Sequence, residues 1–344
     1  MANREKIHFA VIGANHGHIY SQTSVLLDAG AVLDSFFIPE DDLAEGFQSA
    51  FPQASRVLSK DEILESKHIR LVVSAAIPNE RAGVGIEVLR HGKDFMSDKP
   101  GFTNLEQVAL ARQVQAETGG IYSVYFSERL ENPATVKAGE LVQAGAIGQV
   151  VQTAGFGPHR LNLPTRPEWF FQKERYGGIL VDIASHQVDQ FLYFTGSAST
   201  KVLSSVVANY KYPQYPELED YGEMTLRGEH ATGSIRVDWF TPDGLPVWGD
   251  ARLLVLGTEG YLEVRKYIDI AGREGANHLI LVNQNGIEYI DCDSVKCPYA
   301  DQLLADILER SSTAIPQEHV FKASELAIQA ENAAVRMGHL RTKG

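Results

Sequence analysis

Short apolar runs alternate with amphipathic segments along the first third of the chain. Runs rich in β-branched residues are typical of buried strands, and apolar residues three and four positions apart are typical of helices. The predicted strands are Ile7–Ile12, Val32–Ile38, Leu71–Ala75, Asp94–Ser97 and Ile121–Phe126. The predicted helices are Ile19–Ala29, Asp42–Phe51, a short helix opened by a capping box at Ser59–Glu62, Asn79–Arg90 and Leu105–Glu117. Single helices between strands predict a parallel, doubly wound sheet, which binds ligands beyond the carboxyl ends of its strands.

The pattern changes after Phe126. Predicted helices at Asn132–Ala144 and Asp182–Phe194 flank the strand Val150–Phe156. Strand runs then follow at Lys201–Tyr210, Gly222–Leu226, Gly233–Phe240, Arg252–Leu256, Tyr261–Val264, Leu279–Val282 and Ile287–Ile290, and helices at Ala300–Glu309 and Ala323–Met337. We therefore predict an α/β chain with an N-terminal Rossmann-type domain at 1–126. A C-terminal α+β domain with a large, mostly antiparallel sheet is expected at 127–344.

Composition narrows the class of ligand. The 344 residues are 44% apolar and carry a net charge of −13, with no local basic stripe, which argues against nucleic acid as a partner. Cys292 and Cys297 are too few for a disulfide framework or a cysteine-based zinc site. No apolar run approaches the ~20 residues that span a bilayer, and the start of the chain does not have the pattern of a signal peptide. We expect a cytoplasmic protein with a small-molecule ligand.

The turn after the first predicted strand is a candidate dinucleotide site. It reads Gly13-Ala14-Asn15-His16-Gly17-His18 and stands where a pyrophosphate would meet a helix N-terminus. Only the first glycine of the G-x-G-x-x-G fingerprint is in place, so a plain tight turn stays an alternative. His16 and His18 could share a metal, but no third ligand lies nearby in the sequence. We expect them to contact cofactor or substrate and predict no metal.

The end of the second strand normally offers an acid to the ribose hydroxyls. Glu40 or Asp41 could serve here, although both equally suit the first turn of a helix. No Arg or Lys lies in residues 38–42 to hold a 2′-phosphate, which favours NAD over NADP without excluding NADP.

Two further stretches carry side chains suited to proton transfer. Pro100 biases Lys99 towards an extended backbone, so its ammonium should project beyond the fourth strand; a solvated loop lysine is the alternative. Asp182 and His186 are four apart, so one helix would place them on one face, and Asp189 continues that stripe. An imidazole beside a carboxylate suits a proton shuttle, although a surface pair would look the same.

Together these stretches resemble the glucose–fructose oxidoreductase/inositol dehydrogenase (Gfo/Idh/MocA) family over essentially the whole chain. The matching stretches are the turn at Gly13, Ile77-Pro78-Asn79, Asp98-Lys99-Pro100 where the family has Glu-Lys-Pro, Ala144–Gly148, and Gly177-Gly178 leading to Asp182-x3-His186. The resemblance implies that His186 exchanges the proton of a substrate hydroxyl. It also implies that Lys99 stabilises the oxygen and that Asp182 orients His186 or substrate. A cation with a proton source suits the negative charge that carbonyl reduction builds on oxygen.

The resemblance also implies a cofactor-binding set. Its residues are Gly13, Ala14, Asn15, His16, His18, Ile38, Ala76, Pro78, Asn79, Asp98 and Lys99. Asn15 and His18 replace fingerprint glycines, Ile38 falls where the family usually has its ribose acid, and Ala82 falls where a histidine often follows Pro-Asn. These departures all lie on the cofactor side.

Substrate contacts are expected from the second domain. Besides Asp182 and His186, the candidates are Arg129, His159, Arg160, Arg166 and Trp169, because arginines beside a Trp suit a polyol, a sugar ring or a carboxylate. The alternative is that Trp169 belongs to the core and the arginines are rim charges. We assign Trp239 and Trp248 to sheet packing.

We therefore predict an NAD(P)-dependent oxidoreductase that interconverts a secondary alcohol and a ketone on a sugar, cyclitol or sugar acid. Lys99, Asp182 and His186 should converge around one cleft. A redox-neutral epimerase or lyase that retains NAD and a non-catalytic cofactor-binding regulator are the alternatives, with a metal-dependent enzyme using His16 and His18 further behind. The family commonly associates through its large sheet, so a homodimer or homotetramer is expected.

Overall fold

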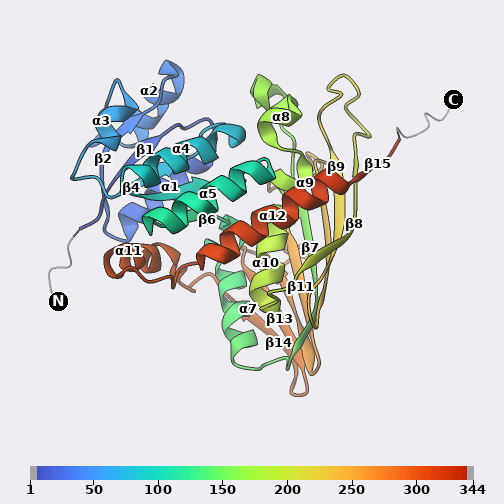
Figure 1. Ribbon diagram of the computed structural model, residues 1–344. Coiled ribbons are helices and arrows are strands. Elements are labelled where there is room, and N and C mark those ends of the chain that lie inside the picture. Colours follow the sequence, from blue (N-terminus) through green and yellow to red (C-terminus); the bar gives the residue numbers. More distant parts are fainter. Residues whose placement is uncertain (1–5, 339–344) are drawn as a thin grey trace. The chain divides into compact units, whose positions relative to one another are not determined.

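The computed structural model describes residues 6–338, which pack into two compact units (Figure 1). Of these residues, unit 1 comprises 6–125 and 298–322, and unit 2 comprises 126–297 and 323–338. The chain first passes from unit 1 to unit 2 between residues 125 and 126, one residue before the predicted boundary. The prediction differs from the structure at 298–322, which was expected in the second domain. This segment packs on unit 1 because Arg310 forms a two-pronged ion pair with Asp94, and the Tyr299 and Ser123 hydroxyls are hydrogen-bonded.

Unit 1 contains a six-stranded sheet whose recorded strand pairs are all parallel. Its order is β3-β2-β1-β4-β5-β6, the arrangement of a doubly wound dinucleotide fold. The strands are β1 His8–Ile12, β2 Val32–Phe37, β3 Ser55–Arg56, β4 Leu71–Ser74, β5 Asp94–Asp98 and β6 Tyr122–Tyr125. The predicted fold class is confirmed, and each predicted strand is present within two residues at either end. The two-residue strand β3 is too short to leave an apolar pattern, and the sequence analysis missed it.

The helices of unit 1 are those that the amphipathic segments predict. They are α1 His18–Asp28, α2 Asp41–Ala50, α3 Lys60–Leu64, α4 Pro78–Arg90, α5 Leu105–Thr118 and α11 Tyr299–Glu309. The capping box at α3 is confirmed, because the Ser59 hydroxyl accepts from the Asp61 N–H and Glu62 accepts from the Ser59 N–H. Helix α4 begins one residue earlier than expected, with Pro78 in its first turn and Ile77 as N-cap.

Unit 2 contains a nine-stranded, mostly antiparallel sheet of order β14-β13-β12-β11-β7-β10-β9-β8-β15. Its strands are β7 Val150–Pro158, β8 Lys201–Ala208, β9 Tyr221–Arg227, β10 Thr232–Asp238, β11 Arg252–Gly257, β12 Gly260–Arg265, β13 His278–Asn283, β14 Gly286–Asp291 and β15 Val335–Arg336. Only the pairs β7–β10 and β8–β15 are parallel. One face of β11, β12 and β13 is apolar and buries Val255, Leu262 and Leu279 against helix α7.

The helices of unit 2 are mostly short. They are α6 Ser127–Leu130, α7 Pro133–Gln143, α8 Lys173–Tyr176, α9 Ile179–Asp182 and α10 Ser185–Thr195, with 3-10 turns at Leu163–Thr165 and Glu168–Phe171. Helix α12, Gln317–Ala333, begins in unit 1 and continues in unit 2. The helix predicted over 182–194 is present as α10 from Ser185, but it begins three residues later than predicted, because Asp182 ends the separate helix α9. The chain turns at Ile183 and Ala184, where the His186 N–H bonds the Ile183 carbonyl three residues back.

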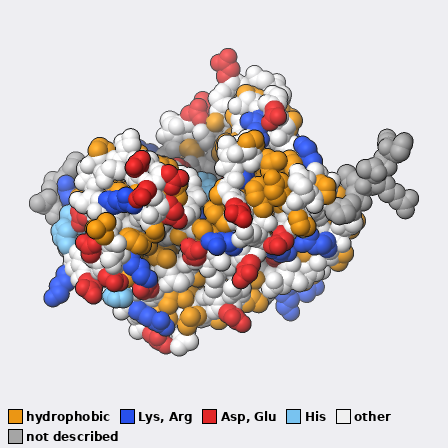
Figure 2. Space-filling view, turned by 90° about the horizontal axis from the view of Figure 1, so that it is seen from above, with side chains coloured by type: hydrophobic (Ala, Val, Ile, Leu, Met, Phe, Trp, Pro, Cys, Tyr) orange, Lys and Arg blue, Asp and Glu red, His pale blue; other side chains and the backbone are white. Residues whose placement is uncertain are grey.

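The described surface visible in Figure 2 has no basic stripe, in agreement with the distribution of Lys and Arg along the sequence. Figure 2 shows acidic and basic side chains interspersed over the visible face rather than gathered into a basic stripe. Within residues 6–338 every helix is too short or too polar to span a lipid bilayer.

Candidate functional site

The turn between β1 and α1 has the backbone geometry that a dinucleotide pyrophosphate needs. Gly13 has a φ of +80°, and a Cβ there would lie 2.7 Å from the Cβ of Ala76, so only glycine fits. The N–H groups of Gly13 and His16 bond the carbonyls of Phe37 and Ala75. The N–H groups of Ala14, Asn15 and Gly17 donate to no carbonyl of the described residues, and they are available to an anion at the start of α1. The backbone of this turn therefore fits a dinucleotide pyrophosphate.

Asp98, at the carboxyl end of β5, contacts both histidines of this turn. Its Oδ1 lies 3.0 Å from His18 Nδ1, and its Oδ2 lies 3.4 Å from His16 Nδ1 and 3.1 Å from Nη2 of Arg81. The carboxylate is completely buried, whereas the His18 side chain is 37% exposed. Burial alone would raise the pKa of Asp98, but the charges of His18 and Arg81 outweigh it and hold that pKa well below its usual range. Burial is the main cause that lowers the pKa of His16 well below its ordinary value, and the charge of the neighbouring His18 is the second cause.

Lys99 follows Asp98 and is nearly buried, with 6% of its surface exposed. Its N–H donates to Asp98 Oδ1 at 2.8 Å, and its carbonyl accepts from the Arg81 guanidinium, which also bonds the carbonyls of Ala76 and Pro100. The Lys99–Pro100 peptide bond is cis. Arg81 thus links the ends of β4 and β5. The sequence analysis missed this residue, because a single arginine in a predicted helix resembles any exposed helical cation.

The other members of the predicted cofactor set lie at the same edge of the sheet. Pro78 and Asn79 open α4, and the buried amide oxygen of Asn79 has no hydrogen-bond donor among residues 6–338. Ile38 follows β2 and is 1% exposed. Its side chain cannot bond a ribose hydroxyl, so any hydrogen bond to the sugar comes from another residue.

The structure separates the two candidate ribose acids. The Glu40 carboxylate accepts from the Asn15 amide at 2.8 Å, which joins it to the glycine turn. Asp41 instead pairs with Arg56 at 2.7 Å. Arg56 comes from β3 and also bonds the Ile38 carbonyl, at 3.2 Å. A guanidinium therefore lies beside the end of β2 after all, which removes the argument against NADP drawn from residues 38–42.

In unit 2 the double glycine precedes helix α9, whose last residue is Asp182. Gly177 and Gly178 have φ values of +94° and +96°. A Cβ on Gly178 would lie 2.3 Å from the carboxyl carbon of Glu331. The Ile179 N–H donates to Glu219 at 3.0 Å, and the Leu180 N–H donates to Glu331 at 3.1 Å. The close approach that the glycines permit is thus to this chain's own carboxylates, which fix the start of α9.

The stripe predicted from Asp182 through His186 to Asp189 is divided by the turn between α9 and α10. Asp182 and His186 are both buried, with 9% and 2% of their surfaces exposed. Asp182 lies close enough to Arg166 for its charge to raise the pKa of that guanidinium, although burial, the larger effect, lowers it. Asp189 is engaged elsewhere, because Arg129 binds both of its oxygens at 2.7 Å. Arg129 also lies over the Tyr193 ring, so this predicted substrate ligand holds α6 against α10.

Beside this helix lies a buried charge network that the sequence analysis did not find. Glu128 accepts from Lys266 at 2.6 Å and from Gln187 at 3.0 Å, and Lys266 also bonds Gln190 at 2.9 Å. Burial raises the pKa of Glu128, but Lys266, followed by His186 and His159, lowers it to about 2. Glu128 precedes the candidate Arg129 in the sequence, whereas Lys266 left no signal there.

The remaining predicted substrate residues are distributed over two clusters of unit 2. The His159 ring lies 4.5 Å from that of Trp248 and 5.4 Å from that of Trp239. Trp248 is 40% exposed in the loop between β10 and β11, so its assignment to sheet packing is wrong, whereas Trp239 is buried. Arg160 bonds the carbonyls of Pro242 and Leu245 and therefore anchors that loop.

Arg166 lies over the rings of Phe170 and Trp239, 4.4 and 4.9 Å from their centroids. Trp169 is partly exposed, and its ring lies 6.0 Å from that of the buried Phe170. An arginine over aromatic rings beside Asp182 fits the recognition of a polar ring-shaped molecule.

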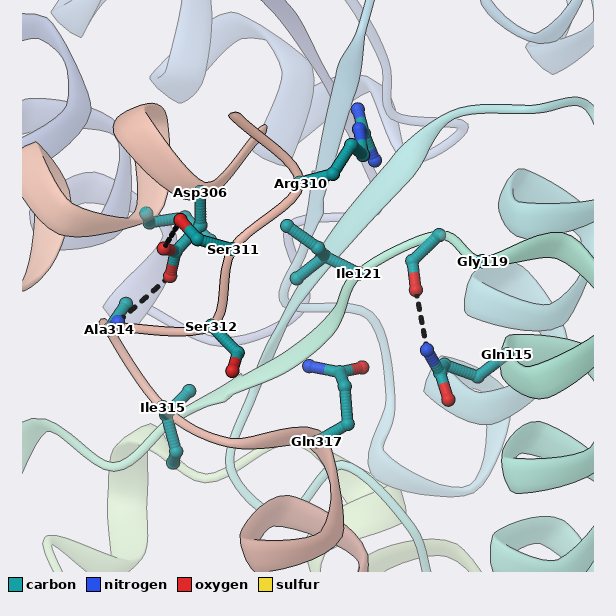
Figure 3. Close-up of a pocket in the computed structure, with 12 residues that line it drawn as sticks. Gln115, Gly119, Ile121, Asp306, Arg310, Ser311, Ser312, Ala314, Ile315 and Gln317 are labelled. Carbon is teal, nitrogen blue, oxygen red and sulfur yellow. Dashed lines mark hydrogen bonds between the residues drawn. The ribbon is translucent and has the colours of Figure 1, made fainter. Parts of the chain in front are cut away.

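A separate pocket of about 240 Å³ lies within unit 1 (Figure 3). It is lined by Gln115, Ile121, Arg310 and Gln317 among others, and Ile121 places it at the amino end of β6. The dashed bonds in Figure 3 show Asp306 held by Ser311 and Ala314. This pocket lies at the end of the sheet opposite to the glycine turn, and its polar groups serve the loop after α11.

Comparisons with known proteins agree with the geometry of both units. Residues 135–263 match the model of the GFO/IDH/MocA C-terminal domain. A provisionally assigned oxidoreductase from Erwinia carotovora atroseptica SCRI1043 is 46% identical, with a TM-score of 0.94 over 97% of this chain and 100% of that one. Levoglucosan dehydrogenase, solved with NADH and levoglucosan, is 16% identical, with a TM-score of 0.81 over 96% of this chain and 97% of that one, and shows the shared fold.

A D-xylose dehydrogenase of Paenarthrobacter nicotinovorans is 26% identical over 132 residues. The match covers 37% of this chain and spans about a third, 34%, of that relative. The names of these relatives are those of oxidoreductases, as the sequence predicted. Because residues 135–263 match the family's C-terminal domain and residues 6–125 form the doubly wound unit expected before it, the chain belongs to the Gfo/Idh/MocA family.

Proposed function

We propose that this chain is an NAD(P)-dependent oxidoreductase that interconverts a secondary alcohol and a ketone on a sugar, cyclitol or sugar acid. The observation that carries the proposal is the carboxyl edge of the unit 1 sheet. There the glycine turn, with its available N–H groups, and Lys99 lie on neighbouring elements connected by Asp98. Relatives named as sugar dehydrogenases, one of them solved with NADH, support the substrate and cofactor classes.

Residues of unit 1 would hold the cofactor. Ala14, Asn15 and Gly17 offer backbone N–H groups to the pyrophosphate, and Glu40, oriented by Asn15, offers a carboxylate to the ribose hydroxyls. Arg56 offers a guanidinium to a 2′-phosphate, so NAD and NADP both have a side chain that suits them. When bound, the nicotinamide accepts or supplies the hydride.

Lys99, Asp182 and His186 would serve the substrate. Lys99 donates a hydrogen bond to the carbonyl or hydroxyl oxygen on which charge develops. His186 takes the hydroxyl proton during oxidation and returns it during reduction. Asp182 orients His186 or substrate. His159 and Arg166, with the aromatic rings that they contact, would bind the rest of the sugar.

Titration of the protein with NADH and with NADPH, followed by nicotinamide fluorescence, tests the cofactor part directly. Saturable binding of at least one is expected. No binding of either would exclude the redox function. A panel of sugars, cyclitols and sugar acids, followed at 340 nm with the bound cofactor type, then identifies the substrate class.

A redox-neutral reaction with retained NAD is the second candidate. Cofactor that copurifies with the protein, and turnover without net change at 340 nm, would distinguish it. Assembly as a homodimer or homotetramer is a further part of the proposal, which light scattering at micromolar concentration tests.

A further inference from the structure

Three side chains with metal-binding atoms converge at the carboxyl edge of unit 1. His16 and His18 come from the turn before α1, and Asp98 comes from the end of β5, 80 residues further along the chain. One donor atom from each lies within 4.8 Å of the other two. The sequence offered only the two histidines, so the third donor is a product of the fold.

The hydrogen bonds around His16 leave two electron-rich atoms facing each other. The His18 N–H donates to His16 Nδ1 at 3.2 Å, which assigns a lone pair to that nitrogen and the proton of the neutral ring to Nε2. The same Nδ1 lies 3.4 Å from Asp98 Oδ2, which accepts no hydrogen bond from residues 6–338 and has Arg81 Nη2 at 3.1 Å as its ion-pair partner. A cation between Nδ1 and Oδ2 would replace the His18 N–H as the partner of the Nδ1 lone pair and would turn this unfavourable approach into two bonds.

The separations suit a small divalent ion. Two ligands each ~2.1 Å from a tetrahedral metal are ~3.4 Å apart. The distance from His16 Nδ1 to Asp98 Oδ2 is 3.4 Å, and that from His18 Nδ1 to Asp98 Oδ1 is 3.0 Å. Arg81 Nη2, which pairs with Oδ2, and the Lys99 N–H, which donates to Oδ1, fix the orientation of the carboxylate, as outer hydrogen bonds do in known metal sites.

We propose that His16, His18 and Asp98 bind one divalent first-row transition-metal ion of the Zn²⁺ class. Two imidazoles and one carboxylate favour such ions over Mg²⁺ and Ca²⁺, which prefer oxygen ligands. Three protein ligands leave at least one position for water or an anionic oxygen, the pattern of a reactive rather than a structural site. The proposal goes beyond the oxidoreductase function, because the metal would bind whether or not a dinucleotide does.

A second cluster allows a matched control. His8, Asp34 and His68 also place donor atoms within 4.8 Å, at the start of β1, within β2 and before β4. In that cluster His68 is 64% exposed, whereas His16 and His18 are 26% and 37% exposed. His68→Ala removes this competing set without touching the proposed site, so it serves as the background for every measurement.

The test is titration of the full chain, stripped with a chelator, with ZnCl₂ by calorimetry and with CoCl₂ by visible absorption. In the His68→Ala background we expect one Zn²⁺ per chain and the ligand-field bands of four- or five-coordinate Co²⁺. Adding His18→Ala should weaken Zn²⁺ binding at least tenfold and abolish those bands. Asp98→Asn should do the same, and circular dichroism shows whether that buried variant folds.

Failure to bind Zn²⁺ in the His68→Ala background would overturn the proposal. Zn²⁺ affinity and Co²⁺ bands unchanged by His18→Ala would also overturn it, because the metal would then lie elsewhere. NADH titration of the metal-free protein tests the oxidoreductase function independently, so failure of either proposal is seen without the other.

Discussion

Two buried carboxylates, Asp98 in unit 1 and Glu128 in unit 2, have different kinds of partners. Asp98 faces two histidines, one of them 37% exposed, besides Arg81. Glu128 faces Lys266 and Gln187, both buried. Histidines near a surface can lose or gain a proton, a metal or an anion, whereas a sealed Glu–Lys pair cannot exchange its partner.

The different partners of the two carboxylates indicate which charged groups are open to a ligand. In unit 2 the predicted ligands Arg129 and Asp189 bind each other, so their charges serve the scaffold around α10. In unit 1 the charges gather at the edge where the glycine turn exposes its N–H groups. Substitutions at the edge should therefore change binding and turnover, and substitutions in the sealed pairs should change stability.

The largest effect is expected from the proposed catalytic residues. Lys99→Ala and His186→Ala should each lower kcat/KM about 10²–10⁴-fold, the range typical of a lost proton donor or acceptor. Steady-state kinetics with the best substrate of the panel measure this, and thermal unfolding should show folded proteins. Lys67→Ala and His230→Ala are controls at exposed positions. Rates close to wild type in both test variants would refute the assignment.

Glu128→Ala should have the largest effect on stability. It leaves the Lys266 ammonium buried without its carboxylate, which typically costs about 3–5 kcal/mol. Urea denaturation measures the free energy of unfolding. The double variant Glu128→Met/Lys266→Met should recover most of the loss, since neither charge of this pair then remains buried. A loss below about 1 kcal/mol for Glu128→Ala would show that water reaches the Glu128–Lys266 pair, so that the pair is not buried in solution.

A third buried carboxylate, that of Glu331, should make the free energy of unfolding depend on pH. Burial, followed by the charge of Glu219, raises the pKa of Glu331 to about 7. A carboxyl group whose pKa is raised in the folded state holds its proton more tightly there, so folding loses stability as pH rises from about 4.5 towards 7. Unfolding free energies at pH 5, 6, 7 and 8 should therefore fall more steeply for wild type than for Glu331→Gln. Parallel curves would contradict the assignment.

The smallest effect on stability is expected at the edge of unit 1. His18→Ala removes a partly exposed pair with Asp98 and should change the free energy of unfolding by less than about 1 kcal/mol. Nicotinamide fluorescence should nevertheless show altered NADH affinity, because His18 belongs to the proposed cofactor turn. A stability loss like that of Glu128→Ala would remove the distinction between the two regions.

Local patterns predicted the elements where one feature dominates each segment. The buried strands β1 and β4 stand out because both faces are largely apolar, and the Ser59 capping box needs only four residues. The break between α9 and α10 was missed because Asp182 through Asp189 has helical spacing throughout. There Glu219 and Glu331, distant in sequence, hold the first N–H groups of α9.

By itself the sequence determined the fold class, the order of elements and the family, because periodicity and short motifs act over a few residues. It also identified the glycine turn, Lys99 and the Asp182–His186 segment as candidates for chemistry. The pairing of charged side chains became known only from the folded chain. It pairs Arg129 with Asp189, Glu128 with Lys266, and Asp98 with His16 and His18. The reason is physical, since the energy of a charge depends on its distance from other charges and on its burial, and both are properties of the folded chain.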